Sequence, residues 1–263
     1  MKHTPSSFME MKGKQRIPML TAYTFPVAAS IESAGIPIIL VGDTVGMVEM
    51  GFSSTRDVTI EHMEYHVGAV RRGAPNTHII GDLPYLTDRS PEVALVNAKR
   101  LMQAGADSIK LEGAKLDVIA HLVANNIPVV GHTGLTPQTA TNFKKVGQSA
   151  EDAQTVSDEA KAIQEAGAFM LVLEHIPSSL GESITQEISI PTIGIGAGAD
   201  CDGQVLVIND ALGHYKVKAV LCHQPMSLHK KYVSCVLNTT HCLFLMKCKR
   251  VLAVQVTYTH TKA

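Results

Sequence analysis

Four short apolar segments of this chain each end in a carboxylate, and this feature constrains the fold most strongly. The segments are IPIILVGD, THIIGD, ADSIKLE and AFMLVLE, which end at Asp43, Asp82, Glu112 and Glu174. Short runs rich in β-branched residues are typical of parallel strands buried on both faces. A carboxylate at the end of such a strand is costly to bury unless it binds something. The repetition therefore predicts one site that the four acids share.

Strand-like and helix-like segments alternate along most of the sequence. Strands are expected near 17–21, 37–41, 77–80, 108–111, 127–130, 169–173, 191–195 and 204–208. Helices are expected at 25–34, 59–72, 91–104, 116–125, 150–166 and 178–187. This pattern predicts an α/β fold, a (β/α)8 TIM barrel, which typically needs about 250 residues, and the chain has 263. An open doubly wound sheet would more often carry a Gly-rich phosphate loop after its first strand, and LTAYTFP at 20–26 is not one.

Several helix ends carry local signals. Ser90 is a good N-cap before Pro91 at the first helical position, and Ser149 precedes two acids in a first turn. Gly105 and Gly167 each follow a helix-like segment and can adopt the positive φ that ends a helix. The segments AGADSIKLE and AGAFMLVLE form a weak internal repeat of helix end, Gly turn, strand and acid.

Composition narrows the classes of partner. The formal net charge of −1 gives no sign of a nucleic-acid partner. No apolar stretch reaches the roughly 18–20 residues that span a bilayer, and the N-terminal segment lacks the apolar core of a secretory signal. The five Cys have no metal-ligand spacing and are typical of reduced thiols in a cytosolic protein. We therefore expect a cytoplasmic protein that binds neither nucleic acid nor membrane, and the candidate site described next points to small-molecule substrates.

The first three acids predict a magnesium site. Oxygen ligands suit a hard cation, and Mg²⁺ is usually held by a few carboxylates together with water and substrate oxygens. In a barrel, Asp43, Asp82 and Glu112 would lie at the C-terminal ends of the strands, where active sites occur. The alternative is that each acid caps a helix or pairs with a nearby cation such as Lys110 or Arg71.

Three further side chains complete the candidate site. Strand alternation places Lys110 on the same face as Glu112, where it could hold a substrate carboxylate or balance charge. His132, at the end of the next strand, could bind substrate or could be a satisfied structural residue. Glu174 is the candidate base because apolar neighbours raise the pKa of a carboxyl group, and the alternative is a supporting acid paired with His175 or Lys110.

The chain also resembles a known enzyme family, ketopantoate hydroxymethyltransferase. The resemblance covers roughly residues 5–218 and rests on VGDTVGMVEMG, HVGAVRRGAPN, GDLPY, ADSIKLEG, VVGHTGLTPQ, LVLEHIP and IPTIGIGAGADCDGQVLVINDALG. It implies a barrel of the phosphoenolpyruvate/pyruvate superfamily. It also implies transfer of a hydroxymethyl group from 5,10-methylenetetrahydrofolate to 3-methyl-2-oxobutanoate, giving 2-dehydropantoate in pantothenate biosynthesis. The family is cytoplasmic and forms homo-oligomers, commonly decamers.

The resemblance implies a role for each matching residue. Mg²⁺ is held by Asp43, Asp82 and Glu112, and the proton acceptor is Glu174. The oxo acid contacts Asp43, Thr44, Asp82 and Lys110. Thr44 stands where the family usually has Ser, and it keeps the hydroxyl while adding a methyl group.

The likeness to the family ends near residue 217. Residues 211–263 hold eight of the 23 Lys and Arg residues and none of the 24 Asp and Glu residues. We therefore expect a catalytic barrel at 1–217 and an atypical basic tail at 218–263, whose composition resembles translation in another reading frame. A genuinely divergent tail is the alternative.

Two other functions fit parts of the sequence. One is a 2-oxo acid lyase of the same superfamily that forms a similar enolate. Such lyases often use a Cys on a mobile loop, and no Cys occurs before Cys201, which disfavours this function. The other is an inactive, poorly closed product of a damaged gene.

Overall fold

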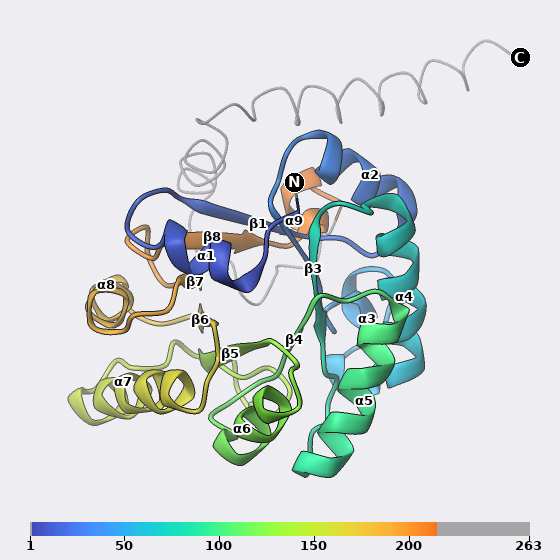
Figure 1. The fold of residues 1–263 in the computed structure, drawn as a ribbon. Helices are drawn as coiled ribbons and strands as arrows, with labels where there is room; N and C mark the ends of the chain where they lie inside the picture. Colours follow the sequence, from blue (N-terminus) through green and yellow to red (C-terminus); the bar gives the residue numbers. More distant parts are fainter. Residues whose placement is uncertain (1, 215–263) are drawn as a thin grey trace, which may run out of the picture.

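A computed structural model describes residues 2–214 of the chain as a closed barrel of eight parallel strands, with no break in the circle (Figure 1). The sheet closes through β1 and β8, where Ile17 pairs with Gly203 and Leu20 with Leu206. The strands are β1 (Ile17–Thr21), β2 (Ile38–Val41), β3 (His78–Asp82), β4 (Ser108–Lys110), β5 (Val129–Gly134), β6 (Met170–Glu174), β7 (Thr192–Ile195) and β8 (Gly203–Leu206). The predicted barrel is confirmed, and the predicted tail at 218–263 lies outside the described residues.

The six predicted helices are present within one or two residues of their expected ends. They are α2 (Phe25–Ser33), α4 (Ile60–Gly73), α5 (Pro91–Ala104), α6 (Leu116–Ala124), α7 (Ala150–Glu165) and α8 (Ser178–Glu187). The sequence patterns did not predict α1 (Pro5–Met11), α3 (Val45–Val48), the 3-10 helix η1 (Thr55–Asp57) or α9 (Ile208–Leu212). These four elements are too short to show a clear helical period, so tertiary contacts decide them.

The predicted helix ends have the expected chemistry. The hydroxyl oxygen of Ser90 accepts from the N–H of Val93, and that of Ser149 accepts from the N–H of Asp152. Gly105 ends α5 at φ +121°, where its N–H donates to the carbonyls of Leu101 and Met102. Local sequence therefore fixes where α5 and α7 begin and where α5 stops.

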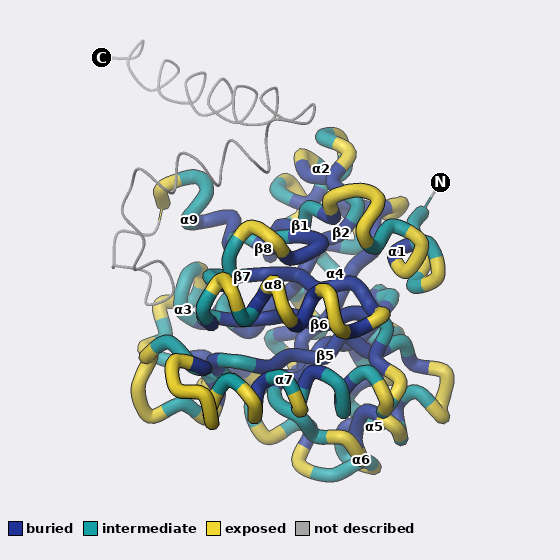
Figure 2. Tube along the Cα trace, turned by 90° about the vertical axis from the view of Figure 1, so that its left-hand side faces the viewer, coloured by how far each residue is buried: buried dark blue, intermediate teal, exposed yellow. Residues whose placement is uncertain are grey.

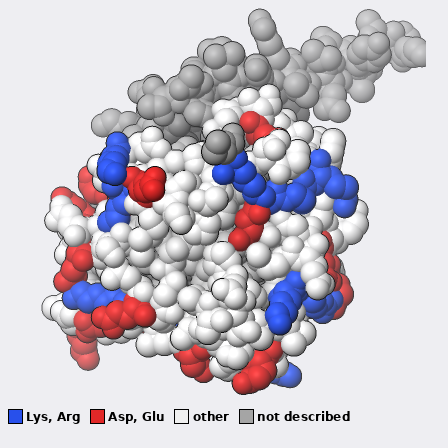
Figure 3. Space-filling view, viewed as in Figure 1, with Lys and Arg blue, Asp and Glu red and all other residues white. Residues whose placement is uncertain are grey.

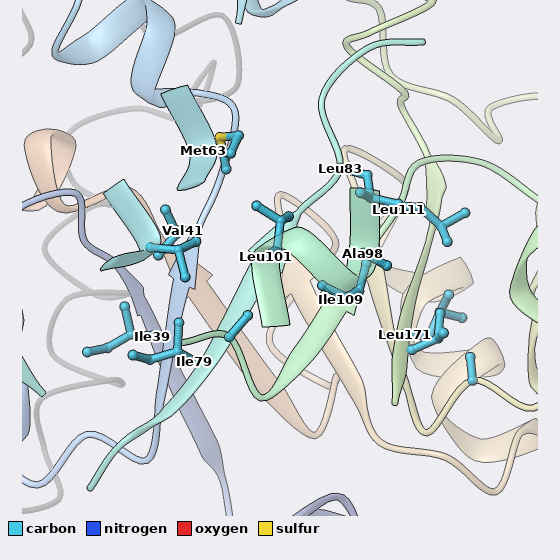
Figure 4. Packing of buried hydrophobic residues seen from close by; sticks show 14 of the residues in the cluster. Ile39, Val41, Met63, Ile79, Leu83, Ala98, Leu101, Ile109, Leu111 and Leu171 are labelled. Carbon is cyan, nitrogen blue, oxygen red and sulfur yellow. The ribbon is translucent and has the colours of Figure 1, made fainter. Parts of the chain in front are cut away.

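Strand alternation divides the apolar residues into two cores. Side chains such as Met19, Ile80 and Val172 fill the barrel interior. Their neighbours on the outer face, including Ile39, Ile79 and Leu171, pack under the helices (Figure 4). In Figure 2 the buried strands lie inside and the exposed positions follow the outer turns of the helices. The interior is therefore a packed core and not a pore, as this fold requires.

The N-terminal end of the barrel is plugged by α1. Phe8 is fully buried within the interior cluster, and its ring meets His78 edge to face with the centroids 5.2 Å apart. His78 and Phe169, which also pack edge to face, come from the starts of β3 and just before β6. With this end closed by apolar residues, the opposite end is left for chemistry.

The surface carries both signs of charge. On the face seen in Figure 3, Lys and Arg lie beside Asp and Glu around the rim. Among the described residues, no helix is long and apolar enough to cross a membrane.

Candidate active site

The candidate residues gather toward the C-terminal ends of five strands, β2 to β6. Asp82, Lys110 and Glu174 are the last residues of β3, β4 and β6. Asp43 and Glu112 follow β2 and β4 by two residues, and His132 lies within β5. All six side chains are buried, with 1–6% of their surface exposed. The barrel therefore brings together residues that are far apart in the sequence.

Lys110 and Asp82 form the central ion pair of the site. The two residues are register partners on adjacent strands, and Lys110 Nζ donates to both carboxylate oxygens of Asp82 at 2.9 Å. Burial disfavours the charged form of Lys110, but the Asp82, Glu112 and Asp43 carboxylates outweigh burial and raise its pKa. Lys110 is therefore a permanent cation in a cluster of acids, and the charge-balancing role considered for it is present.

Two of the acids are held in an environment that resists their ionisation. Burial, reinforced by repulsion from Asp82, raises the pKa of Asp43 to about 7. Burial also raises the pKa of Glu112 to about 9, although Lys110 opposes the shift. A pair of buried carboxylates with raised pKa values favours a bound cation, because a cation would replace the protons that the pair otherwise retains.

His132 and Glu174 lie side by side with unused hydrogen-bonding capacity. His132 Nε2 is 3.1 Å from Glu174 Oε2, and His132 Nδ1 is 4.0 Å from Glu112 Oε1. Within residues 2–214, both ring nitrogens of His132 and Oε1 of Glu174 are buried without a hydrogen-bond partner. Buried polar atoms normally have partners, so these atoms are available for a ligand.

Thr44 follows Asp43 directly in the sequence. It is half-buried and precedes α3, but its side chain makes no capping hydrogen bond there.

The other cation considered for the acids, Arg71, instead pairs with Asp107. Of the pairings considered for the acids, the one between Asp82 and Lys110 is present.

Gln138 belongs to the site, and sequence reasoning did not single it out. It is 1% exposed and contacts both Asp43 and Glu112. It lies in the GLTPQ segment, on the loop between β5 and α7. Its signal in the sequence was its place at the end of the VVGHTGLTPQ motif, a few residues beyond His132.

The carboxylates fit Mg²⁺ by donor type, burial and raised pKa. Among residues 2–214, no three His, Cys, Asp or Glu side chains are gathered closely enough to form a metal-binding group by themselves. Both carboxylate oxygens of Asp82 accept hydrogen bonds from Lys110. Mg²⁺ needs no all-protein cage, since one or two carboxylates with water and substrate oxygens commonly bind it.

Comparison with known proteins decides the family. A sequence model described as ketopantoate hydroxymethyltransferase matches residues 2–238. The chain belongs to this family. The match extends beyond residue 217, and the domain boundary proposed there stays a prediction.

The names of curated relatives agree with membership of the ketopantoate hydroxymethyltransferase family. A protein named 3-methyl-2-oxobutanoate hydroxymethyltransferase from Caldivirga maquilingensis is 43% identical over 231 residues, which cover 86% of this chain and 84% of the relative. A protein of the same name from Chloroflexus aggregans is 49% identical over 221 residues, covering 82% and 79%. The chain is therefore an enzyme of the hydroxymethyltransferase kind, as the sequence motifs predicted.

Solved structures confirm the fold. A 2,3-dimethylmalate lyase, a member of the PEP mutase/isocitrate lyase superfamily, superposes with a TM-score of 0.62 at 16% identity and covers 81% of each chain. A phosphonopyruvate hydrolase in complex with oxalate and Mg²⁺ has a TM-score of 0.63 at 13% identity, covering 98% of this chain and all of that one. At these identities the likeness concerns the barrel and not the reaction.

Proposed function

We propose that this ketopantoate hydroxymethyltransferase family member transfers a hydroxymethyl group from 5,10-methylenetetrahydrofolate to 3-methyl-2-oxobutanoate, giving 2-dehydropantoate. The family match and the names of the curated relatives support the reaction. The observation that carries the chemistry is a buried carboxylate, Glu174, with an unpartnered oxygen beside His132. Such a site suits removal of a proton next to a carbonyl group.

The residues divide into binding and proton-transfer roles. Asp43, Asp82 and Glu112 would hold Mg²⁺, which when bound supplies Lewis-acid stabilisation of negative charge on substrate oxygens. Lys110 offsets the charge of the substrate carboxylate, while Asp43, Thr44, Asp82 and His132 orient the oxo acid. The phosphonopyruvate hydrolase complex indicates that a barrel of this fold can accommodate Mg²⁺ together with a small dicarboxylate.

Glu174 performs the first chemical step. Its carboxylate takes the proton from C3 of the oxo acid, and the electrons of the broken C–H bond form the enolate. His132, 3.1 Å from Glu174, can donate a hydrogen bond to the substrate while Glu174 holds the proton. The one-carbon unit leaves the folate at the oxidation level of formaldehyde: water supplies its oxygen, both of its C–N bonds break, and the two folate nitrogens take up the two protons of the water. The enolate carbon attacks this carbon and forms the new C–C bond, while the oxygen of the transferred group takes up the proton held by Glu174.

The lyase alternative finds no support in the site. Cys201 is buried just before β8, at the opposite end of the barrel from Glu174. Burial raises the pKa of its thiol, so it is a poor nucleophile there. The family match also favours transfer over cleavage. The damaged-gene hypothesis concerns the tail, which lies outside the described residues.

We also propose that the protein is cytoplasmic and forms a homo-oligomer, as its family resemblance implies. Light scattering coupled to size exclusion of the full chain tests the oligomer. A single species at the monomer mass would contradict it.

Hydrogen–deuterium exchange tests the proton-transfer step without folate. Full-length protein with Mg²⁺ should exchange the C3 hydrogen of 3-methyl-2-oxobutanoate in D₂O, followed by proton NMR. Replacing the base by Glu174→Gln should slow exchange by roughly 10²–10⁴-fold, the usual contribution of a general base. Magnesium binding by that variant, measured by calorimetry, should be largely retained. Absence of exchange in the folded, Mg²⁺-loaded protein would overturn the proposed function, and normal exchange by Glu174→Gln would assign the base elsewhere.

A further inference from the structure

Gln138 connects four loops at the mouth of the barrel. Its backbone N–H donates to Glu112 Oε2 at 3.0 Å, and its side-chain Nε2 donates to Asp43 Oδ2 at 2.9 Å. The same Nε2 donates to the carbonyl of Leu83 at 3.0 Å. Asp43, Leu83 and Glu112 follow β2, β3 and β4, whereas Gln138 follows β5. One residue therefore contacts two acids that follow different strands.

The orientation of the Gln138 amide follows from its partners. The Leu83 carbonyl can only accept a hydrogen bond, so the amide NH₂ group, and not its oxygen, must face it. Asp43 Oδ2 shares that NH₂ group. Gln138 is consequently a donor to both buried acids, which is the arrangement that favours their charged forms.

Arg56 holds the Gln138 loop from the solvent side. Its Nε donates to the carbonyl of Gln138 at 2.7 Å, and its Nη2 donates to that of Ala140 at 3.1 Å. Its guanidinium carbon also lies 5.6 Å from the ring centroid of Tyr85, on the loop after β3. The loop that carries Gln138 is thus fixed on both its buried and its exposed sides.

We propose that Gln138 is a positioning residue of this enzyme, which holds Asp43 and Glu112 in the separation and orientation that the Mg²⁺ site uses. The inference rests on the proposed function. Two buried carboxylates repel each other and would turn apart without donors between them. A residue that donates to both keeps them directed at a common ligand, which lowers the cost of assembling the site when the cation binds.

Calorimetric titration of the full-length protein with Mg²⁺ tests the proposal directly. Gln138→Met keeps the length of the side chain and the backbone N–H but removes the donor to Asp43. Loss of a hydrogen bond to a charged group corresponds to roughly 10–100-fold in affinity, so the Mg²⁺ dissociation constant should rise by that factor. The matched control is Gln154→Met, which removes an exposed donor to Asp158 on α7 and should leave the constant unchanged.

The dependence of C3 exchange on Mg²⁺ separates positioning from folding. In Gln138→Met the half-saturating Mg²⁺ concentration should rise, while saturating Mg²⁺ should restore the exchange rate to within about threefold of wild type. A merely structural role would reduce the amount of active protein without moving the half-saturation point, and that result would overturn the proposal.

Arg56→Met provides a second variant if Gln138→Met does not fold, because Arg56 is exposed and leaves Gln138 intact. Arg56→Met should also raise the Mg²⁺ dissociation constant, by roughly threefold, because Arg56 supports the loop that carries Gln138 but does not itself donate to Asp43 or Glu112. An unchanged constant in both variants, or no Mg²⁺ binding by wild type, would overturn the inference. Wild-type protein that binds Mg²⁺ but exchanges no C3 hydrogen would instead overturn the proposed function alone.

Discussion

Replacing Lys110 by Met should destabilise the protein far more than the loss of an ordinary ion pair. Lys110 Nζ contacts both oxygens of Asp82, and the two side chains are only 7% and 3% exposed. Removing one partner of a buried pair leaves the other charge uncompensated, which costs about 3–5 kcal/mol. For a domain of this size the melting temperature should fall by roughly 6–20 °C.

The pH range of this effect follows from the pKa of Lys110. The folded protein raises that pKa above the value of about 10.4 in an unfolded chain. The stabilisation that Lys110 contributes to the folded state is therefore complete at neutral pH. It is lost only as the pH rises above the pKa of Lys110 in the unfolded chain. Measurements between pH 7 and 8 report its full size.

A double-mutant cycle identifies the cause of the loss. Urea unfolding with EDTA present should be compared for wild type, Lys110→Met, Asp82→Asn and the double variant. Because Asp82→Asn removes the uncompensated charge, the double variant should recover about 1–3 kcal/mol relative to the sum of the single losses. Lys161→Met is the control, since it breaks an exposed pair with Glu187 and should cost at most about 1 kcal/mol. A Lys110→Met loss no larger than this control, or strict additivity, would refute the reasoning.

Two further predictions concern the scaffold. Burial lowers the pKa of His78 to about 4, so the folded state resists its protonation and stability should be lost as the pH falls from about 6.5 to 4. Urea unfolding at pH 7 and pH 4.5 measures this loss. Between these two pH values the free energy of unfolding of His78→Gln should fall by about 2–3 kcal/mol less than that of wild type. Equal losses in the two proteins would show that protonation of His78 is not the cause. Gly105→Ala places a Cβ 2.7 Å from the Arg71 side chain at φ +121°, so it should destabilise by about 1–3 kcal/mol in thermal or urea unfolding. Gly35→Ala has positive φ but open space and should cost less, and the reverse order would show that the clash is not the cause.

Much of the fold could be predicted from the sequence because the patterns that specify strands, turns and helix ends are local. The apolar runs that became β2, β3 and β6 are bounded by turn residues and end in acids. The caps Ser90 and Ser149 and the positive φ of Gly105 involve only neighbouring residues. Once parallel strands alternate with helices, closure into a barrel sends every strand end to one rim, so the approximate place of the acids also follows.

The roles of the site residues needed contacts between distant segments. No local pattern reveals that Lys110 binds Asp82 in preference to Glu112, because the choice depends on the register of β3 against β4. Phe8 closes the barrel only because α1 folds back over the starts of other strands.

The sequence by itself determined the order of strands and helices and the family, and it predicted six candidate site residues that the barrel places toward one end. Periodicity, turn residues and motifs operate over a few residues, so a single chain displays them directly. Only the tertiary structure decided how the charges are compensated, with Lys110 against Asp82 and Gln138 between Asp43 and Glu112. The physical reason is that the cost of a buried charge depends on which groups lie within a few ångströms of it, and the barrel brings those groups together from four strands, β2 to β5, and the loops that follow them.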